Sequence, residues 1–165
     1  MILRRATAAD LDAIWQLYYD TITTVNTADY DPLQIVIWAA GHTNLPRWEA
    51  ALAEQDFFVA ELDVSNEMQQ LVGFSSITAA GYLDFMFVHR AYQRRGIARQ
   101  LLAAVEQVAA ARNLSKIWAE VSITARPFFA AHGYTITERF VKTVNGVAFD
   151  DAVMTKGLGS TISSI

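Results

Sequence analysis

The fold of this chain is decided by one stretch, Tyr82-Leu83-Asp84-Phe85-Met86-Phe87-Val88-His89-Arg90-Ala91-Tyr92-Gln93-Arg94-Arg95-Gly96-Ile97-Ala98. Its first half predicts a β-strand over 82–89, with Asp84 on the face of Tyr82 and Val88 and with Leu83, Phe85 and Phe87 on the other face. Its second half leads into a regular amphipathic helix over 96–112. The start of a helix presents unpaired N–H groups and the positive end of the helix dipole, so it binds anions. Small residues at 96 and 98 would let phosphate groups reach those N–H groups.

The elements around this stretch follow from caps, turns and periodicity. Thr7 and Asp31-Pro32 predict the starts of two helices, and Asn145-Gly146 predicts a hairpin turn. We expect a short strand at 2–5, a third short helix at 47–54, strands at 57–62 and 71–77 joined by a polar turn at 65–67, a strand at 116–122, a helix at 125–132 and two final strands. This order predicts an α+β fold around one mixed sheet.

Length and composition limit the function classes. The 165 residues fit a single domain, which we place at 1–156, with a disordered tail at 157–165. The chain has no cysteine, which excludes disulfides and a cysteine nucleophile, and no cluster of ligand residues predicts a metal site. The net charge of -4 argues against a nucleic-acid partner, and no apolar run is long enough for a membrane span. We therefore expect a cytoplasmic protein.

Two segments resemble the GNAT superfamily (GCN5-related) of N-acetyltransferases. Residues 82–102 resemble its motif A, whose pattern is Q/R-x-x-G-x-G/A, and residues 122–134 resemble its segment N-x-x-A-x-x-F-Y-x-x-x-G-F. The sequence is most similar to small bacterial-type members whose second motif reads A-R-P-F-F/Y. The resemblance covers about residues 2–156. It implies the GNAT fold, one mixed, mostly antiparallel sheet of six or seven strands with a central splay, flanked by helices.

The resemblance also implies acetyl-CoA as co-substrate and a set of residues that bind it. The backbone of Phe87 and Val88 would pair with the pantetheine arm, amides of residues 94–98 would hold the pyrophosphate, and residues 122–129 would border the thioester. The expected cofactor-binding residues are Phe87, Val88, Gln93, Arg94, Arg95, Gly96, Ile97, Ala98, Arg99, Ser122, Arg126 and Phe129. Ser122 and Phe129 depart from the family pattern, where Asn and Tyr are usual. Phe129 cannot donate a proton to the departing thiolate.

Direct transfer of an acetyl group to an amine needs that amine in its neutral form, so a base is expected. Asp84 is the first candidate for this base, and Glu61 and Glu120 are weaker alternatives; Asp84 could equally be a structural carboxylate or an anchor for the substrate ammonium. Tyr30, Trp38 and Tyr82 are candidates for the acceptor wall, because aromatic residues suit an apolar or cationic acceptor.

The leading hypothesis is thus N-acetylation of a small-molecule amine or of a protein amino group, with a homodimer through the last strands left open. One alternative, prompted by Phe129, is a non-catalytic acyl-CoA-binding or sensing module. A nucleotide-binding domain is a third interpretation, but no Walker lysine follows Gly96.

Overall fold

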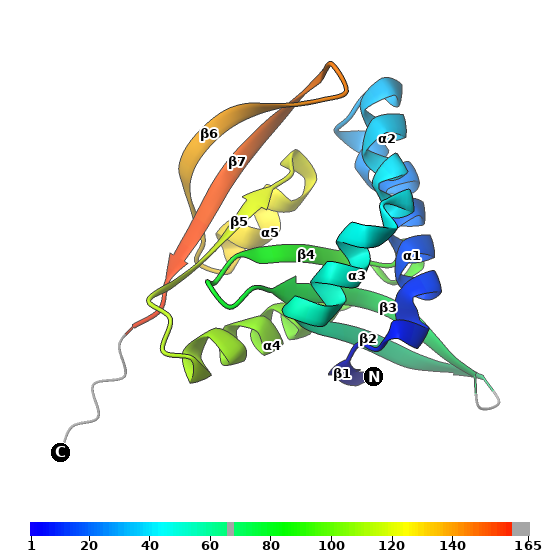
Figure 1. Ribbon diagram of the computed structural model, residues 1–165, viewed down its shortest axis with the longest axis vertical. Helices are drawn as coiled ribbons and strands as arrows, with labels where there is room; N and C mark the ends of the chain where they lie inside the picture. The colour runs from blue at the N-terminus through cyan, green and yellow to red at the C-terminus, as the bar shows by residue number, and fades with distance from the viewer. Residues whose placement is uncertain (66–67, 160–165) are drawn as a thin grey trace.

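The structure, a computed structural model, describes residues 1–65 and 68–159. Figure 1 shows the twelve longer elements in chain order. They are β1 (Ile2–Arg5), α1 (Leu11–Thr24), α2 (Pro32–Ala39), α3 (Leu45–Glu54), β2 (Asp56–Ser65), β3 (Met68–Ile77), β4 (Leu83–Val88), α4 (Ile97–Ala111), β5 (Lys116–Val121), α5 (Arg126–Ala131), β6 (Thr135–Val144) and β7 (Val147–Gly157). Short 3-10 turns are η1 (Ala8–Asp10), η2 (Asn26–Ala28), η3 (Ala40–Thr43), η4 (Arg90–Tyr92) and η5 (Ile123–Ala125).

Local signals set the starts of the first helices and the last hairpin, as predicted. Thr7 and Asp10 form a capping box, in which the Thr7 N–H donates to Asp10 Oδ2 at 2.7 Å. Asp31 accepts from the Gln34 N–H at 2.9 Å, directly before the proline that opens α2. At the β6–β7 turn, Asn145 and Gly146 have φ values of 49° and 79°, as expected for a two-residue hairpin turn.

The seven strands form two antiparallel groups rather than one continuous ladder. One group has the order β1-β2-β3-β4 and the other β5-β7-β6. Within the described residues, a single parallel bridge joins them, between Tyr82 and Trp118, where the Trp118 N–H donates to the Gly81 carbonyl at 3.0 Å. Beyond this bridge β4 and β5 separate. The expected sheet of six or seven strands with a central splay is therefore present, with seven strands that the splay divides into four and three.

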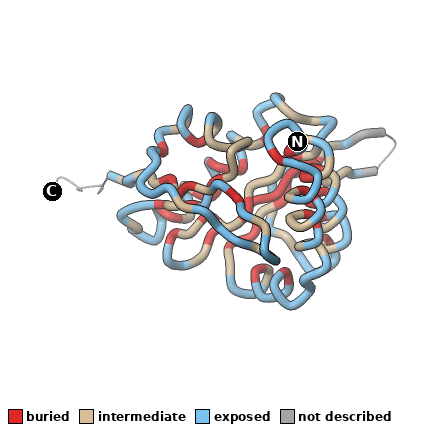
Figure 2. Tube along the Cα trace, turned by 90° about the horizontal axis from the view of Figure 1, so that it is seen from above, coloured by how far each residue is buried: buried red, intermediate tan, exposed pale blue. Residues whose placement is uncertain are grey.

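Three clusters of buried apolar residues hold the layers together, two of them beneath α4. On one face of the four-stranded sheet, α1 to α3 pack on aromatic side chains such as Phe57, Phe74 and Phe85. On the other face, α4 packs through Leu102 and Val105 on residues of both strand groups. Figure 2 shows the buried positions concentrated inside these layers. The helix α4 thus connects the two halves of the sheet and brings its first residues to the end of β4 (Figure 1).

The predicted alternation along β4 is wrong at its start. Ile77 pairs with Leu83 and Ser76 pairs with Phe85, so Asp84 is an extra, bulged residue. Leu83 consequently packs in the core under α4, while Phe85 packs under the N-terminal helices. A bulge reverses the face of every residue before it, which a period-two pattern does not reveal.

The predicted boundary between the domain and its tail, at residues 156 and 157, can be compared with the structure. The strand β7 includes Gly157, and the Leu158 N–H donates to the Ser115 carbonyl at 2.8 Å, so the ordered fold extends slightly past the expected boundary. Residues 160–165 of the predicted tail, and residues 66 and 67 of the predicted polar turn, lie outside the described residues. In the described part of the chain, no helix combines the length and apolarity that a bilayer crossing demands.

Candidate active site

The loop between β4 and α4 exposes the start of a long helix. Arg94 and Gly96 have positive φ values of 63° and 80°. Ile97 is buried and anchors the helix, whereas Gly96 and the arginines at 94, 95 and 99 are exposed. A Cβ added at Gly96 would meet no atom within 4 Å. The first N–H groups of α4 therefore face open space beside three cations, an arrangement that suits a phosphate-bearing ligand.

Side-chain bonds fix this loop to the end of β4. Gln93 Nε2 donates to the Val88 carbonyl at 2.6 Å, and the Thr21 hydroxyl donates to the same oxygen at 3.2 Å. The Tyr92 hydroxyl donates to Gln70 Oε1 at 2.9 Å, and the Arg95 guanidinium lies 5.1 Å from the centre of the Tyr92 ring. The glutamine of the predicted motif thus orients the loop from within, and the three arginines stay free of ion pairs with described residues.

Phe87 and Val88, the two residues expected to pair with pantetheine, point their backbone N–H and C=O groups to opposite edges of β4. The His89 N–H donates to the Val72 carbonyl at 2.8 Å, so residues at odd positions of this segment, including Phe87, bond to β3. Val88 and Met86 point their backbone groups toward the gap before β5. The Val88 carbonyl already accepts two bonds, which leaves its N–H and the backbone of Met86 for a ligand in the gap.

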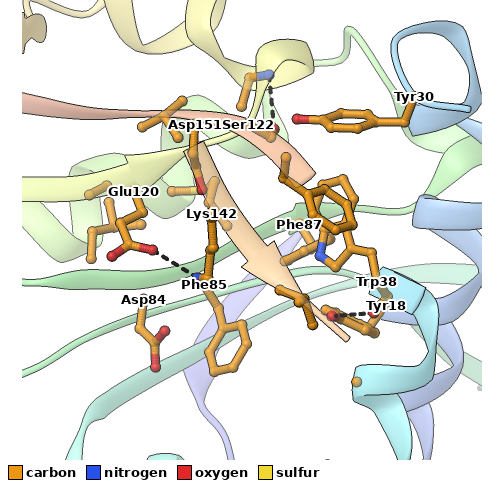
Figure 3. A pocket seen from close by; sticks show the side chains of 18 of the residues that line it. Tyr18, Tyr30, Trp38, Asp84, Phe85, Phe87, Glu120, Ser122, Lys142 and Asp151 are labelled. Atoms are coloured by element: carbon orange, nitrogen blue, oxygen red, sulfur yellow. Dashed lines mark hydrogen bonds and ion pairs between the residues drawn. The ribbon is translucent and has the colours of Figure 1, made fainter. Parts of the chain in front are cut away.

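A cavity of about 310 Å³ lies where β4 and β5 separate. Tyr30, Trp38 and Tyr82, the three predicted acceptor residues, all line it, as do Phe87, Ser122 and Phe129 of the predicted cofactor-binding set. Figure 3 shows Tyr30, Trp38, Phe87 and Ser122 around this cavity. Residues 93–99 do not line it. They adjoin it, because Phe87 is in its wall and the next residue, Val88, is bonded to Gln93.

The cavity wall is aromatic and carries an excess of carboxylates. Its aromatic residues are Tyr18, Tyr30, Trp38, Tyr82, Phe85, Phe87, Phe129 and Phe149. Its carboxylates are Asp84, Glu120, Asp150 and Asp151, against two lining cations, Arg47 and Lys142. Burial raises the pKa of Tyr30 and Tyr82 above that of a free tyrosine and raises the pKa of Tyr18 to about 12. These hydroxyls therefore keep their protons at neutral pH.

Asp84 lines the cavity, yet both of its oxygens are occupied. Arg47 Nη2 donates to Oδ1 at 2.7 Å and Gln55 Nε2 donates to Oδ2 at 2.9 Å. Ser76 in turn donates to Gln55 Oε1 at 2.7 Å. The predicted apolar surroundings are thus wrong, because the bulge turns this carboxylate toward α3. Its contacts are those of a carboxylate that fixes α3 to the sheet.

Glu61, the alternative base, lies outside the cavity. It is on β2 opposite Ile2, is buried, and pairs with Arg4, which also pairs with Asp10. Three charges are held together at the edge of the sheet, away from the cavity, and these contacts are those of a structural carboxylate.

The segment 122–129 borders the cavity from the side of β5. The Ser122 side chain accepts from the Ala125 N–H at 3.3 Å and caps η5, and the Tyr30 hydroxyl accepts from the Ile123 N–H at 2.8 Å. Phe129 is buried. Arg126 was expected to bind the cofactor, but its guanidinium reaches Asp150 Oδ1 of β7 at 3.0 Å instead of the loop at 93–98.

Asp151 is the site residue that sequence reasoning missed. It lines the cavity, its Oδ1 accepts from the Ala152 N–H at 2.9 Å, and it is half-buried whereas Asp150 is exposed. Burial, with a smaller contribution from the nearby charge of Glu120, raises the pKa of the Asp151 carboxyl. Adjacent residues of a strand point to opposite faces, so the pair of aspartates does indicate that one points inward, although not which one.

The comparisons with known proteins agree on one family. A family model described as an acetyltransferase (GNAT) domain matches residues 27–156. The uncharacterized N-acetyltransferase YafP of Escherichia coli (strain K12) is 28% identical over 152 residues, which cover 92% of this chain and 93% of that protein. A GCN5-related N-acetyltransferase from Rhodopseudomonas palustris has a TM-score of 0.87 at 27% identity and covers 95% of both chains.

A more distant structure has the same fold. The PaiA N-acetyltransferase from Thermoplasma acidophilum, solved in complex with coenzyme A, has a TM-score of 0.75 at 15% identity and covers 95% of this chain and 98% of its own. The resemblance carried by residues 82–102 and 122–134 is thereby confirmed. With a family model that matches most of its length and a divided sheet of the same fold, this chain belongs to the GNAT acetyltransferase family and is an acyltransferase of that family.

Proposed function

We propose that the chain transfers an acetyl group from acetyl-CoA to the amine of a small molecule or protein, by direct attack within a ternary complex. The observation that carries this proposal is the position of the cavity. It begins at the gap between β4 and β5 and adjoins the exposed start of α4, so a ligand with a phosphate end and a thioester end can occupy both at once. The coenzyme A complex of the PaiA acetyltransferase, which shares the fold, supports the same ligand here.

Each part of the site has a defined task in this reaction. The N–H groups of residues 94–98 bind the pyrophosphate, and the arginines at 94, 95 and 99 add charge. The free edge of β4 binds the pantetheine amides as a strand would. The acceptor enters the aromatic cavity, its nitrogen attacks the thioester carbonyl carbon, and the carbon–sulfur bond breaks. No covalent enzyme intermediate is needed, in keeping with a sequence that has no cysteine.

The loop is tested by two substitutions within it, Gly96→Val and Ala98→Leu, and by Gly146→Val as a control at a matching backbone conformation. Gly96 and Gly146 have φ values of 80° and 79°, and a Cβ at either meets no atom within 4 Å. Gly96→Val and Gly146→Val should therefore lower the melting temperature by similar amounts, since a side chain in this region costs about 1–2 kcal/mol. In a calorimetric titration, Gly96→Val and Ala98→Leu should each weaken acetyl-CoA binding by tenfold or more, whereas Gly146→Val should not weaken it. Unchanged affinity in both loop variants would remove the proposal.

A non-catalytic acyl-CoA-binding module is the second candidate, favoured by one observation. Phe129, which lines the cavity, has no hydroxyl to protonate a leaving thiolate. A screen for thiol release over classes of amines separates the two candidates. Binding of acetyl-CoA without thiol release for any amine would support the module, and release with one class of amine would support the enzyme.

A further inference from the structure

The four carboxylates of the cavity differ in how they are neutralised. Asp84 pairs with Arg47, Glu120 with Lys142 at 2.9 Å, and Asp150 with Arg126. Asp151 alone among them makes no ion pair within the described residues, and its one hydrogen bond comes from the next backbone N–H. It is thus the one cavity carboxylate whose charge is not matched by a contacting cation of the protein.

Charged and polar side chains from several elements surround Asp151. Burial is the main cause that raises the pKa of the Asp151 carboxyl, and the charge of Glu120 on β5 adds to it. The Ala152 N–H, Lys142 of β6 and Arg126 of α5 act in the opposite direction. The hydroxyls of Tyr30 and Tyr82 also lie within reach of its charge. Figure 3 shows Asp151 in the cavity wall together with Glu120, Lys142 and Ser122.

We propose that Asp151 accepts the proton of the acceptor ammonium, and that the acceptor is a small primary amine with one positive charge and an apolar body. This inference rests on the proposed function and assigns the base and the acceptor class of the same site. A single unmatched carboxylate suits one ammonium group, because the charges of the other three are matched by side chains of the protein. Aromatic walls suit an apolar body and contribute cation–π attraction.

The proton balance of the step is complete. Asp151 takes one proton from the ammonium, which leaves the neutral amine. The carbon–nitrogen bond forms, the carbon–sulfur bond breaks, and the second proton of the nitrogen goes to the thiolate, so the products are the acetamide and free thiol. Asp151 then releases its proton to water. A carboxylate with a raised pKa suits this exchange, because the driving forces for accepting and releasing the proton are closer to balance near neutral pH.

The cavity also limits the acceptor by size and charge. About 310 Å³ is at the small end of ligand pockets, which favours a compact molecule such as 2-phenylethylamine. A substrate carboxylate would lie near Glu120, Asp150 and Asp151 and be repelled. We therefore expect thiol release with 2-phenylethylamine to exceed that with phenylalanine, which differs from it only by a carboxylate, by at least tenfold in kcat/KM.

The test compares two acceptors in two variants. Asp151→Asn removes the base but keeps the shape, and Asp63→Asn is the matched control, an exposed aspartate of β2 away from the cavity. The acceptors are 2-phenylethylamine, which is protonated at neutral pH, and phenylhydrazine, which is neutral and needs no base. With 2-phenylethylamine, Asp151→Asn should lose about 100-fold or more in kcat/KM, and its remaining rate should rise tenfold per pH unit. With phenylhydrazine the loss should be less than threefold.

Two further measurements make the result interpretable. Acetyl-CoA affinity by calorimetry should be equal in wild type and Asp151→Asn. The raised pKa means that the ionised carboxylate opposes folding at neutral pH, so the substitution should not lower the melting temperature. If wild type fails to bind acetyl-CoA, the proposed function fails. If wild type acetylates 2-phenylethylamine and Asp151→Asn does so equally well, or loses both acceptors alike, Asp151 is not the base. If wild type acetylates amines but prefers phenylalanine, the acceptor class is wrong.

Discussion

At the scale of single residues, Asp84 is held by a chain of bonds that runs from α3 to β3. Its side chain is only 8% exposed, and the chain includes Arg47, Gln55 and Ser76. An amide at this position keeps the shape of the side chain but loses its negative charge and one of its two acceptor oxygens, so it can no longer accept fully from both Arg47 and Gln55. The contacts assign Asp84 to the attachment of α3, which carries Trp48 into the core.

We expect Asp84→Asn to lower the free energy of unfolding by about 1 kcal/mol, because one charged hydrogen bond to a half-exposed arginine is weakened. Denaturant unfolding measures this loss. The pH profile of acetyl transfer should keep its shape, with its acidic limb in place. A variant with wild-type stability and no acidic limb would instead return Asp84 to the role of base.

For the site, the loop before α4 could be predicted from the sequence, whereas the roles of the cavity carboxylates could not. Gly96 and Ala98 lie at the start of α4, and a helix start is determined by local sequence, so the position of the loop follows from the sequence. The roles of Asp84 and Asp151 depend on a bulge and on the orientation of β7. Both are set by contacts between distant segments, and a register change of one residue reverses the outcome.

At the scale of elements, α4 packs tightly against β3 at Gly73, where there is no room for a side chain. A Cβ there would lie 2.9 Å from Leu101 Cδ1 and 3.0 Å from the Phe87 carbonyl oxygen. The side chain of Leu101 can move, but the backbone of β4 is part of the ladder. Gly73 therefore fixes the distance between β3, β4 and the start of α4.

Gly73→Ala should destabilise the fold by about 1–3 kcal/mol, as overpacking of a core does. It should also weaken acetyl-CoA binding, because α4 and the β4 edge move apart at the ligand. Gly157→Ala, at the end of β7 where a Cβ meets no atom within 4 Å, is the matched control. Thermal unfolding and calorimetry report the two effects, and unchanged affinity in a destabilised Gly73→Ala would separate α4 from the binding site.

The order of helices and strands along the chain could be predicted, whereas the place where the two strand groups meet and separate could not. Caps at Thr7 and Asp31 and the turn at Asn145-Gly146 are local signals that act through backbone bonds. Among the described residues the two strand groups meet at the bridge between Tyr82 and Trp118, which are 36 positions apart in the sequence. Periodicity carries no information about where two strands separate.

At the scale of the whole molecule, the edge at β1 is held by charges rather than by an apolar face. Asp10, Arg4 and Glu61 form one network, and Ile2 and Leu3 are exposed. The hydrogen bond from Arg4 lowers the pKa of the Asp10 carboxyl, helped by the Thr7 N–H and opposed by burial. Because the folded pKa lies below the ordinary one, ionised Asp10 stabilises the fold above that ordinary value, and the contribution is lost as the pH falls through the folded pKa.

We expect Asp10→Asn to lower the free energy of unfolding at pH 7 by about 2 kcal/mol, the size of a charged hydrogen bond. The difference from wild type should shrink below the ordinary pKa of 3.8, where the wild-type carboxyl takes up its proton in the unfolded chain. Denaturant titrations at several pH values measure it. A difference that grew toward acid would mean that Asp10 is protonated in the native state.

The divided sheet also divides the polypeptide. All four strands of the first group come from residues before 89, and all three of the second come from residues after 115. Each group is assembled from neighbouring segments, and α4 makes most of its sheet contacts with β2, β3 and β4 of the earlier one. The turn at Asn113, where φ is 54°, is the junction between them. A backbone cut at that turn leaves two fragments that each retain a whole strand group, so the enzyme is suited to reconstitution from separately expressed halves.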